Sequence, residues 1–554
     1  MKRLRISKQI RPYARVVVWA LTIFVAGRFF GLLIGNGVTD LANVDASYEN
    51  ASLPMDARIE DLLSRMTTEE KVGQMALVEK DSLWFRSDIA RYGIGGILSG
   101  AGAGPDENTP EAWFAMVNGF QRDALENRLH IPMLYGVDAV HGNANVIGAT
   151  VFPHAIGLGA GGDAELVRRI GAITANELVA TGIHWNFAPS VDVVEDTRWG
   201  RTYETFGSNS ETVARLGAAY LQGLQSETPG GGRVIGTAKH YLGTGAMTWG
   251  TSGNPDFHID QGVTDVDEAT LRETHLPPFA AAVNEGVSCV MVGHAAWNGI
   301  EMAANRFLLT NVLKGELGFD GFVVSDWYGV YEIPGGEYHA VVEAVNAGVD
   351  MVMLPYDYVS FVGYVERALA NGDIAAERVD DAVRRILRAK FVVGLFDASL
   401  AEAADRSGFG SAEHRLVARE AVRKSLVLLK DDGAALPIRA DADRIVVGGS
   451  AADNIGRQSG GWTVEWQGID GNWIPGTTIL QGLRDFVSPE TSVAYSLTGG
   501  GLGRGRCRLA SGNGRPGRGR RAVRRVSVYG NIADRVETIV SSPHYAENHA
   551  APLV

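Results

Sequence analysis

The sequence predicts an α/β protein that consists of a TIM-like (β/α)8 barrel followed by a second α/β unit. Seven short apolar runs alternate with amphipathic segments such as A-E-L-V-R-R-I-G-A-I-T-A-N-E-L, and most of the runs end in a polar or charged residue. This alternation is typical of parallel strands joined by helices, and a barrel carries its chemistry at the strand ends. An open doubly wound sheet is the alternative, because it would use the same strand ends. The runs are I-G-G-I-L-S-G, I-P-M-L-Y-G-V-D, H-W-N-F-A-P-S-V-D, G-T-A-K-H-Y, S-C-V-M-V-G-H, G-F-V-V-S-D and V-D-M-V-M-L-P.

Helices are expected on both sides of these runs. A helix is predicted to start at Leu53-Pro54-Met55-Asp56, and M-T-T-E-E-K predicts a second start with Thr67 or Thr68 as its cap. A long helix near 411–425 opens the second unit, in which S-L-V-L-L-K and R-I-V-V-G-G-S-A are expected to be strands. The Gly- and Trp-rich segment D-N-I-G-R-Q-S-G-G-W-T-V-E-W-Q-G is suited to a loop that lines a cleft.

The N-terminus has the pattern of an export signal. Six basic residues precede an apolar run over 16–34, which indicates a cleaved signal peptide or an uncleaved membrane anchor. A buried core helix is the remaining interpretation. We therefore expect an exported protein that is periplasmic or is anchored to the inner membrane and faces the periplasm. The predicted segments are the signal or anchor at 1–35, a linker at 36–52, the barrel at 53–410, the start of the second unit at 411–498, and an Arg/Gly-rich tail at 499–554.

The composition excludes several classes of protein. The net charge of -13 over 554 residues disfavours binding to nucleic acid, and limits membrane contact to the N-terminal segment. The two cysteines, Cys289 and Cys507, cannot form a disulfide framework or a zinc cluster. An acidic surface suits a soluble enzyme and leaves its substrate and oligomeric state open.

The strand ends supply the candidate functional residues. The aromatic ring of Trp327 beside the carboxylate of Asp326 is a good platform for a sugar, although a strand-end aspartate can also cap the next helix. Lys239 could form a Schiff base, as in aldolases, or simply form an ion pair. The strand-end candidates are Asp138, Asp192, Lys239, His240, His294 and Asp326.

Three other groups of residues allow two interpretations each. Asp138 and His141 could belong to a metal site, but no third ligand has a matching spacing. Arg198 and Arg201, which follow Asp192 and Asp196, could form a structural ion-pair network or contact substrate. Trp462 and Trp466 could lie in a buried turn or bind a ligand.

Taken together, these segments resemble glycoside hydrolase family 3, in particular its β-glucosidase and glucan exohydrolase branch. The resemblance runs in order from about residue 50 to residue 498. Its motifs are G-V-D-A-V-H-G, A-T-V-F-P-H-A-I-G-L-G, N-F-A-P-S-V-D-V, R-W-G-R-T-Y-E-T-F-G, A-K-H-Y-L-G, V-M-V-G-H-A-A-W-N-G, V-V-S-D-W and G-G-W-T-V-E-W-Q-G.

The resemblance implies a fold, an activity and a site. The second unit would be an α/β sandwich domain, and the active site would lie between it and the barrel. The expected function is that of a retaining, exo-acting β-glucosidase that hydrolyses terminal β-D-glucosyl residues of glucans or oligosaccharides, with Asp326 as the nucleophile and no metal or organic cofactor. The substrate-binding residues implied by the resemblance are Asp138, Arg201, Lys239 and His240 on the sugar hydroxyls, Met291 in the same pocket, and Trp327 and Trp462 around the next sugar.

The chain departs from the family at two places. Thr244 stands where relatives commonly have aspartate. The loop after Tyr241 also lacks the Gly-His-Gly and Asp-Ser-His pattern of the N-acetylglucosaminidase branch, which disfavours that branch. The second departure concerns the acid/base glutamate, which a retaining mechanism needs roughly 5–5.5 Å from the nucleophile. The resemblance places it near R-R-A-V-R-R-V (520–526), but residues 499–525 contain nine Gly, nine Arg and no acidic residue.

We interpret the Arg/Gly bias as a reading frame that is shifted from about residue 498 onward, because the same codons read one nucleotide later permit E-P-Y-A-E. A second interpretation takes Glu547, in Y-A-E, as the acid/base after an insertion. A third takes the stretch as a disordered nucleic-acid-binding tail. Without its acid/base, the protein would be a catalytically impaired sugar-binding relative, and this is the alternative function.

Overall fold

A closed barrel forms the larger part of the computed structural model, which describes residues 46–254, 257–397, 405–429 and 436–498. Hydrogen bonds join its parallel strands in the orders β11-β1-β2-β3-β4 and β10-β7-β5. Single bridges close the ring, Ser190–Lys239 between β4 and β5 and Val324–Met351 between β10 and β11. This closure confirms the (β/α)8 barrel and excludes the open sheet. The strands are β1 (Ala76–Glu79), β2 (Gly96–Ser99), β3 (Leu134–Val137), β4 (Trp185–Asn186), β5 (Thr237–Tyr241), β7 (Cys289–Val292), β10 (Phe322–Val324) and β11 (Val352–Leu354).

All seven expected strands are present, and β1 is the eighth strand, which was not predicted. It has four residues, all of them buried, and a single residue separates it from helix α3 (Thr68–Gln74). An apolar run this short after a helix continues the helical pattern, so periodicity does not reveal it. The predicted cap of α3 is confirmed as Thr67, which forms a capping box with Glu70.

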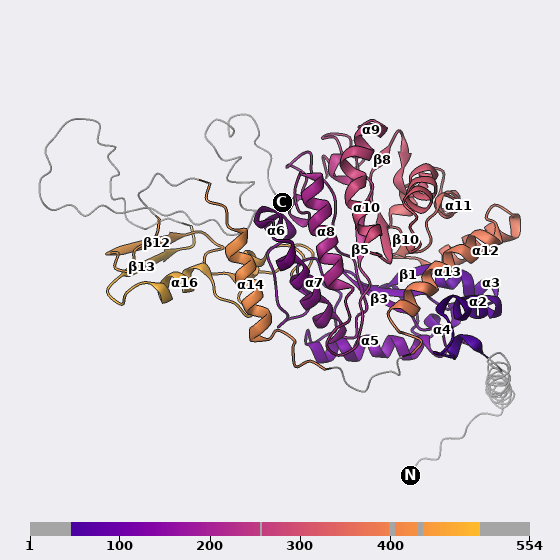
Figure 1. Ribbon diagram of the computed structural model, residues 1–554, viewed down its shortest axis with the longest axis horizontal. Helices are drawn as coiled ribbons and strands as arrows, with labels where there is room; N and C mark the ends of the chain where they lie inside the picture. The colour runs from indigo at the N-terminus through magenta and orange to yellow at the C-terminus, as the bar shows by residue number, and fades with distance from the viewer. Residues whose placement is uncertain (1–45, 255–256, 398–404, 430–435, 499–554) are drawn as a thin grey trace, which may run out of the picture.

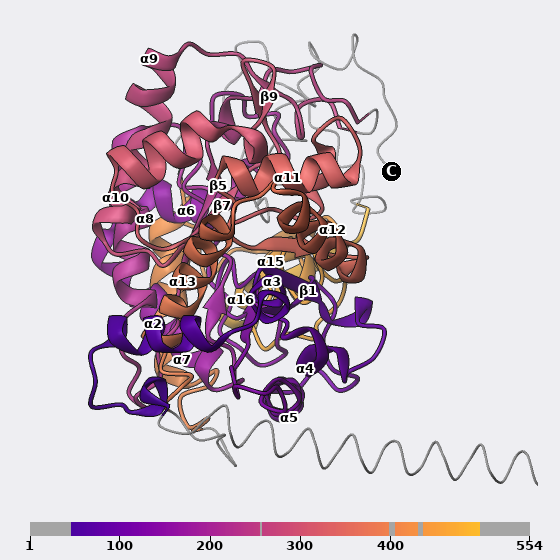
Figure 2. The same cartoon turned by 90° about the vertical axis from the view of Figure 1, so that its right-hand side faces the viewer.

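Helices surround the barrel (Figure 2). They bury their apolar faces against the strands, and one contiguous core extends through the barrel and under the helices. The helices of this ring are α2 (Met55–Arg65), α3, α4 (Asp88–Tyr92), α5 (Pro110–Ala124), α6 (Ala155–Gly161), α7 (Ala164–Val179), α8 (Ser210–Leu224), α9 (Glu268–Thr270), η5 (Leu271–His275), α10 (Leu276–Asn284), η7 (Phe307–Glu316), α11 (Glu337–Ala347), α12 (Tyr358–Asn371) and α13 (Ala376–Val392).

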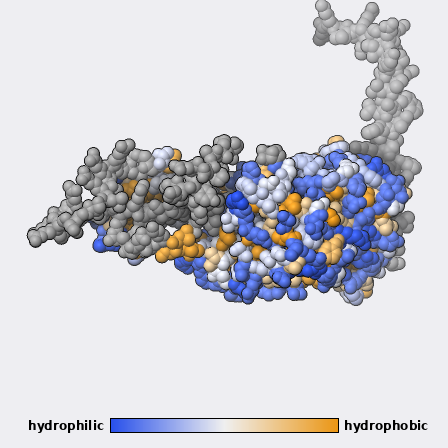
Figure 3. All heavy atoms as spheres, turned by 90° about the horizontal axis from the view of Figure 1, so that it is seen from above, coloured by the Kyte–Doolittle hydropathy of each residue, from blue (hydrophilic) through white to orange (hydrophobic). Residues whose placement is uncertain are grey.

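Small elements decorate the loops at the strand ends. A three-stranded sheet, in the order β6-β8-β9, lies outside the barrel ring, and short helical turns lie in the connections. Figure 3 shows a mainly hydrophilic outer face with scattered apolar residues, as expected for an acidic protein in water. The small elements are β6 (Val263–Thr264), β8 (Ala296–Trp297), β9 (Ile300–Glu301), η1 (Ser47–Glu49), η2 (Lys80–Ser82), η3 (Thr202–Glu204), η4 (Thr244–Ala246), η6 (Met302–Ala304) and η8 (Gly329–Glu332).

The second unit lies to one side of the barrel, beyond helix α14 (Ala412–Ser425), which contacts α6 and α7 (Figure 1). Its strands β12 (Arg444–Gly448) and β13 (Ser492–Ser496) pair in parallel. Helix α16 (Ile479–Phe486) contacts β13, and helix α15 (Ile455–Ser459) precedes the Gly- and Trp-rich loop. The predicted helix near 411–425 and the strand in R-I-V-V-G-G-S-A are therefore present.

The prediction of a strand at S-L-V-L-L-K is wrong for the described residues 425–429. They form no strand, and Leu426, Leu428 and Leu429 are exposed. Only β12 and β13 pair in the described part of this unit, so the segment has no neighbouring strand to join there. An apolar run forms a strand only where such a neighbour accepts its hydrogen bonds.

The predicted linker at 36–52 extends too far along the chain. Tyr48 is buried, and its hydroxyl donates to the Leu129 carbonyl at 2.9 Å. The guanidinium of Arg58 donates to the Tyr48 carbonyl at 2.7 Å, so the chain is already packed on the barrel at this point. The predicted signal or anchor at 1–35 and the tail at 499–554 lie outside the described residues. Among the described helices, none has the length and apolar character needed to cross a bilayer.

Candidate active site

Asp326 lies two residues beyond the end of β10, at the carboxyl-end mouth of the barrel. Its Oδ1 accepts the backbone N–H of Trp327 at 2.6 Å. Its Oδ2 faces two imidazoles, with Nε2 of His294 at 3.6 Å and Nε2 of His240 at 3.9 Å. Both distances exceed hydrogen-bond length, so these rings act on the carboxylate through their charge.

Charges keep Asp326 ionised. Burial alone would raise the pKa of its carboxyl, but the nearby charges of His294, His240 and Arg201 hold that pKa well below its usual range. His294 is buried as well, which lowers its pKa, yet Asp326 and Glu332 together raise that pKa to about 10. The Nδ1–H of His294 donates to Glu332 at 2.8 Å. His294 is therefore an imidazolium at neutral pH and lies beside an ionised carboxylate.

Strand β5 supplies the next two predicted residues. The Nζ of Lys239 donates to Asp138 Oδ1 at 2.6 Å, and the lysine side chain is only 2% exposed. A lysine Nζ held by a carboxylate in this way is not free to attack a carbonyl carbon, which argues against a Schiff-base mechanism. The Nδ1 of His240 contacts Asp192 Oδ2 at 2.8 Å, and the same oxygen accepts the backbone N–H of His240. This contact fixes the orientation of the His240 ring toward Asp326.

Arg201 forms a two-pronged ion pair with Glu204, with distances of 2.8 Å and 2.9 Å. Glu204 is buried, which would raise its pKa, but the charge and hydrogen bonds of Arg201 lower that pKa to about 2. The neighbouring Arg198 pairs instead with Asp196 at the surface. The charge of Arg201 is among those that lower the pKa of Asp326.

The Gly- and Trp-rich loop of the second unit reaches over the barrel mouth. His154 Nε2–H donates to the Gly461 carbonyl at 2.9 Å, and His141 Nε2 contacts Thr463 Oγ1 at 3.1 Å. The two imidazoles stack with their centroids 4.0 Å apart. These contacts place the ring of Trp462 above Lys239, with the ammonium 5.4 Å from the ring centroid. Because His141 Nδ1 contacts the Phe152 carbonyl, both of its ring nitrogens have protein partners.

Four buried polar atoms around this site have no hydrogen-bond partner among the described residues. They are Oδ2 of Asp326, Nε2 of His240, Oδ1 of Asp192 and Nε1 of Trp462. Buried polar atoms are rarely left unpaired, and a cluster of them calls for an explanation. A ligand with several hydroxyl groups would supply the partners. Trp327, which is 37% exposed, offers an aromatic face beside them.

The structure thus brings together most of the predicted residues. Met291 is buried in β7 and lies in register with Val324, the last residue of β10. Asp326 follows Val324 by two residues. Thr244, at the position of the family departure, is buried and donates to the His240 carbonyl at 3.3 Å. Sequence reasoning missed the supporting carboxylates, Glu204 and Glu332. The spacing of Arg201 and Glu204 within one short turn could have revealed the first; Glu332 gave no such sign.

The comparisons with known proteins match this geometry. The sequence profile of the Glycosyl hydrolase family 3 N terminal domain matches residues 67–389, which include every barrel strand. The chain belongs to glycosyl hydrolase family 3.

Relatives and solved structures agree with this assignment. The lysosomal beta glucosidase of Dictyostelium discoideum is 33% identical, over 80% of this chain and 57% of that protein. The periplasmic beta-glucosidase of Salmonella typhimurium is 30% identical, over 80% of this chain and 56% of that protein. The crystal structure of an exo-1,3/1,4-beta-glucanase from a Pseudoalteromonas species has 40% identity and a TM-score of 0.74, with 80% of this chain and 56% of that chain covered. The chain therefore spans less than two thirds of the length of these three proteins.

Proposed function

We propose that this chain is a retaining, exo-acting β-glucosidase that removes terminal β-D-glucosyl residues from glucans or oligosaccharides. The observation that carries this proposal is the Oδ2 atom of Asp326, which is buried, ionised and without a hydrogen-bond partner among the described residues. A retaining glycosidase needs such a carboxylate to attack the anomeric carbon and form a glycosyl-enzyme. Similarity to proteins named beta-glucosidase and exo-glucanase supports a β-glucoside as the substrate class.

The surrounding residues suit the recognition of one terminal sugar. Lys239 and Asp138, already paired, present a donor and an acceptor for neighbouring hydroxyls, and Arg201 and His240 add further donors. Such charged hydrogen bonds are strong in a buried site, and they reject a ring that lacks the matching hydroxyl. Met291 would give the pocket an apolar wall. Trp327 and Trp462 would hold the next sugar between their rings.

The acid/base residue is proposed to come from the second unit, after residue 498, where it lies outside the described residues. Its task is to protonate the leaving oxygen and then to activate water against the glycosyl-enzyme. A shifted reading frame would restore a glutamate near 520–526, and Glu547 is the other candidate. The alternative function, a sugar-binding relative that does not turn over, is favoured by the absence of any acidic residue in 499–525.

We further propose that the protein is exported. The basic flank and apolar run at 1–35 support export, as do relatives whose names describe them as periplasmic. Whether this segment is cleaved or retained as an anchor is measured by the mass of the N-terminal peptide of the protein isolated from its cell.

The test of the proposed activity uses dinitrophenyl β-glucoside, whose leaving group departs without an acid. Proton NMR of the early products is expected to show β-glucose, or β-glucosyl azide when azide is present, because two inversions at the anomeric carbon retain its configuration. The Asp326→Asn variant should release no dinitrophenol above background. An α-configured product, or equal activity of the variant, would reject the proposal. Sugar binding without any turnover in the unsubstituted chain would support the alternative.

A further inference from the structure

A group of exposed aromatic residues lies on the barrel rim next to the candidate active site. Trp84 is 60% exposed, Phe85 66% and Tyr356 62%, and Tyr328 is 38% exposed. We call these four residues the aromatic rim. They lie on the loops that follow β1, β10 and β11, which are neighbours in the barrel. Scattered exposed aromatics need no explanation, but a cluster beside a site marks a binding surface.

Contacts link the three loops that carry the aromatic rim. The ring centroids of Tyr328 and Tyr356 lie 5.5 Å apart in an edge-to-face arrangement. Pro355, next to Tyr356, accepts a hydrogen bond from the Ser82 hydroxyl, which ties the loop after β11 to the loop after β1. In that loop, the backbone N–H of Trp84 donates to the hydroxyl of Tyr358 at 3.2 Å, and the two rings lie 6.1 Å apart. The three loops are therefore held next to one another on the barrel rim.

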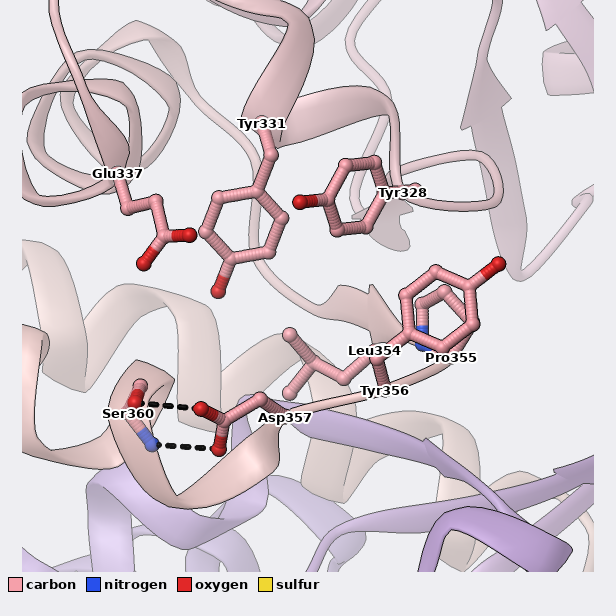
Figure 4. A pocket seen from close by; sticks show the side chains of 8 residues that line it. All are labelled: Tyr328, Tyr331, Glu337, Leu354, Pro355, Tyr356, Asp357 and Ser360. Atoms are coloured by element: carbon pink, nitrogen blue, oxygen red, sulfur yellow. Dashed lines mark hydrogen bonds between the residues drawn. The ribbon is translucent and has the colours of Figure 1, made fainter.

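A pocket of about 80 Å³ opens beside Tyr328 and Tyr356, in the part of the rim that the loops after β10 and β11 form (Figure 4). The rings of Tyr328, Tyr331 and Tyr356 line one part of it, and the carboxylates of Glu337 and Asp357 line another. Aromatic faces beside hydrogen-bonding groups suit a sugar, whose ring has apolar faces and a polar edge. The two carboxylates and the net charge of -13 disfavour an anionic ligand.

The backbone of Tyr328 supports a functional role for its ring. Tyr328 has φ = +60°, in the left-handed region that glycine adopts most readily. A tyrosine held there, with its ring partly exposed, is a local strain of the kind that clusters at ligand-binding sites. Trp327 is the residue before it and lies directly after Asp326. The aromatic rim thus begins where the candidate active site ends.

We propose that the aromatic rim binds the distal sugars of a neutral β-glucan chain whose terminal glucose occupies the site of Asp326. The proposal rests on the proposed function and adds to it the residues that would select chains longer than a disaccharide. The glucan would contact Trp327 next to the proposed nucleophile and then Tyr328 and Tyr356. Its more distant sugars would contact Trp84 and Phe85. Stacking on aromatic rings tolerates several linkages, because every pyranose has an apolar face.

The test measures binding of oligosaccharides to the full chain that carries Asp326→Asn, so that the ligand is not consumed. Calorimetric titration is performed with glucose, laminaribiose and laminarihexaose. We expect laminarihexaose to bind about tenfold more tightly than laminaribiose, since each stacked ring adds roughly a factor of two to ten and more than one ring would stack. Adding Tyr356→Ala or Trp84→Ala should remove most of this gain. The matched control is Phe486→Ala, an equally exposed aromatic on α16, away from the barrel face (Figure 1), and it should keep the gain.

Two results would overturn the proposal: laminarihexaose binding no more tightly than laminaribiose, or a gain that persists in both rim variants. Because Tyr356 and Trp84 are mostly exposed, their truncation leaves the core intact, and circular dichroism checks this. Labelling of Asp326 in the unsubstituted chain by a fluorinated glucoside tests the proposed function separately. If Asp326 is labelled but affinity does not rise with chain length, only the proposal for the aromatic rim is rejected. If affinity rises with chain length through the rim but Asp326 is not labelled, the proposed enzymatic function is rejected and the rim is still a glucan-binding surface.

Discussion

Replacement of His294 by glutamine is expected to make the reaction of Asp326 far more sensitive to acid. The imidazolium of His294 lies 3.6 Å from the Asp326 carboxylate and is the foremost of the charges that lower the pKa of that carboxyl. Glutamine keeps a hydrogen-bond donor but has no charge. Without that charge, burial of Asp326 would raise its pKa, and the carboxylate would take up a proton at a higher pH than in the unsubstituted protein.

The size of this shift follows from the distance. Opposite charges about 4 Å apart attract by roughly 4 kcal/mol at an effective dielectric constant near 20. At about 1.4 kcal/mol per pKa unit, this sets a ceiling of about three units. His240 and Arg201 remain close to the carboxylate, so their charges still lower its pKa. We therefore expect the pKa of Asp326 to rise by about one to two units.

The assay is the second-order rate at which a fluorinated glucoside inactivates the protein, measured against pH. When dinitrophenolate is the leaving group of this glucoside, the rate reports attack by Asp326 and does not depend on the acid/base residue. In the unsubstituted protein the rate should stay constant well below the usual range of a carboxyl, and in His294→Gln it should fall at a pH about one to two units higher. The matched control is His339→Gln, a histidine on the surface helix α11. If the inactivation rate of His294→Gln falls at the same acidic pH as that of the unsubstituted protein, the electrostatic role of His294 is refuted.

Three further predictions concern the supporting contacts and the missing acid/base. Glu204→Gln should lower the free energy of unfolding by about 3 kcal/mol, because it removes the carboxylate paired with the mostly buried Arg201 and leaves only the more distant charges of Asp326 and Asp260. Glu165→Gln, which breaks an exposed pair of the same spacing, should leave the denaturant midpoint unchanged. Burial and the neighbouring His141 lower the pKa of His154 to about 3, from 6.5 in the unfolded chain. Between these two values the unfolded chain binds the proton and the folded protein does not, so acidification through this range should destabilise the protein. His154→Gln should therefore make the melting temperature fall less steeply between pH 7 and pH 4, and an equally steep fall would contradict this. If no acid/base is present, the protein should cleave dinitrophenyl β-glucoside but barely cleave cellobiose, and azide should accelerate turnover of the dinitrophenyl substrate. Equal rates on the two substrates would show that the acid is present.

The barrel could be predicted from sequence because its strands are short apolar runs that end in recognisable polar residues. The missed strand, Ala76–Glu79, has no such break from the preceding helix. The wrongly predicted strand at 425–429 has the right composition, but strand formation depends on a partner strand that composition does not report. Tyr48 was assigned to a linker because one buried aromatic among small residues has no period to detect.

The site divides in the same way. Asp138, Lys239, His240 and Asp326 follow from the rule that strand ends carry chemistry, and the family resemblance added Arg201, Met291 and the two tryptophans. The structure shows how these side chains are held, through partners far away in sequence such as Asp192 for His240 and Glu332 for His294. Such long-range pairs have no local sequence pattern, so single-sequence reasoning could not name them. The roles of these residues in catalysis remain predictions.

Mass spectrometry after treatment with a fluorinated glucoside tests the central claim most directly. The protein should gain the mass of one fluoroglucosyl group, and peptide mapping should place it on Asp326, in the segment G-F-V-V-S-D-W. The Asp326→Asn variant should gain no mass under the same conditions. A label on any other residue, or no label on a protein that still binds glucose, would contradict the claim that glycosyl transfer begins at Asp326.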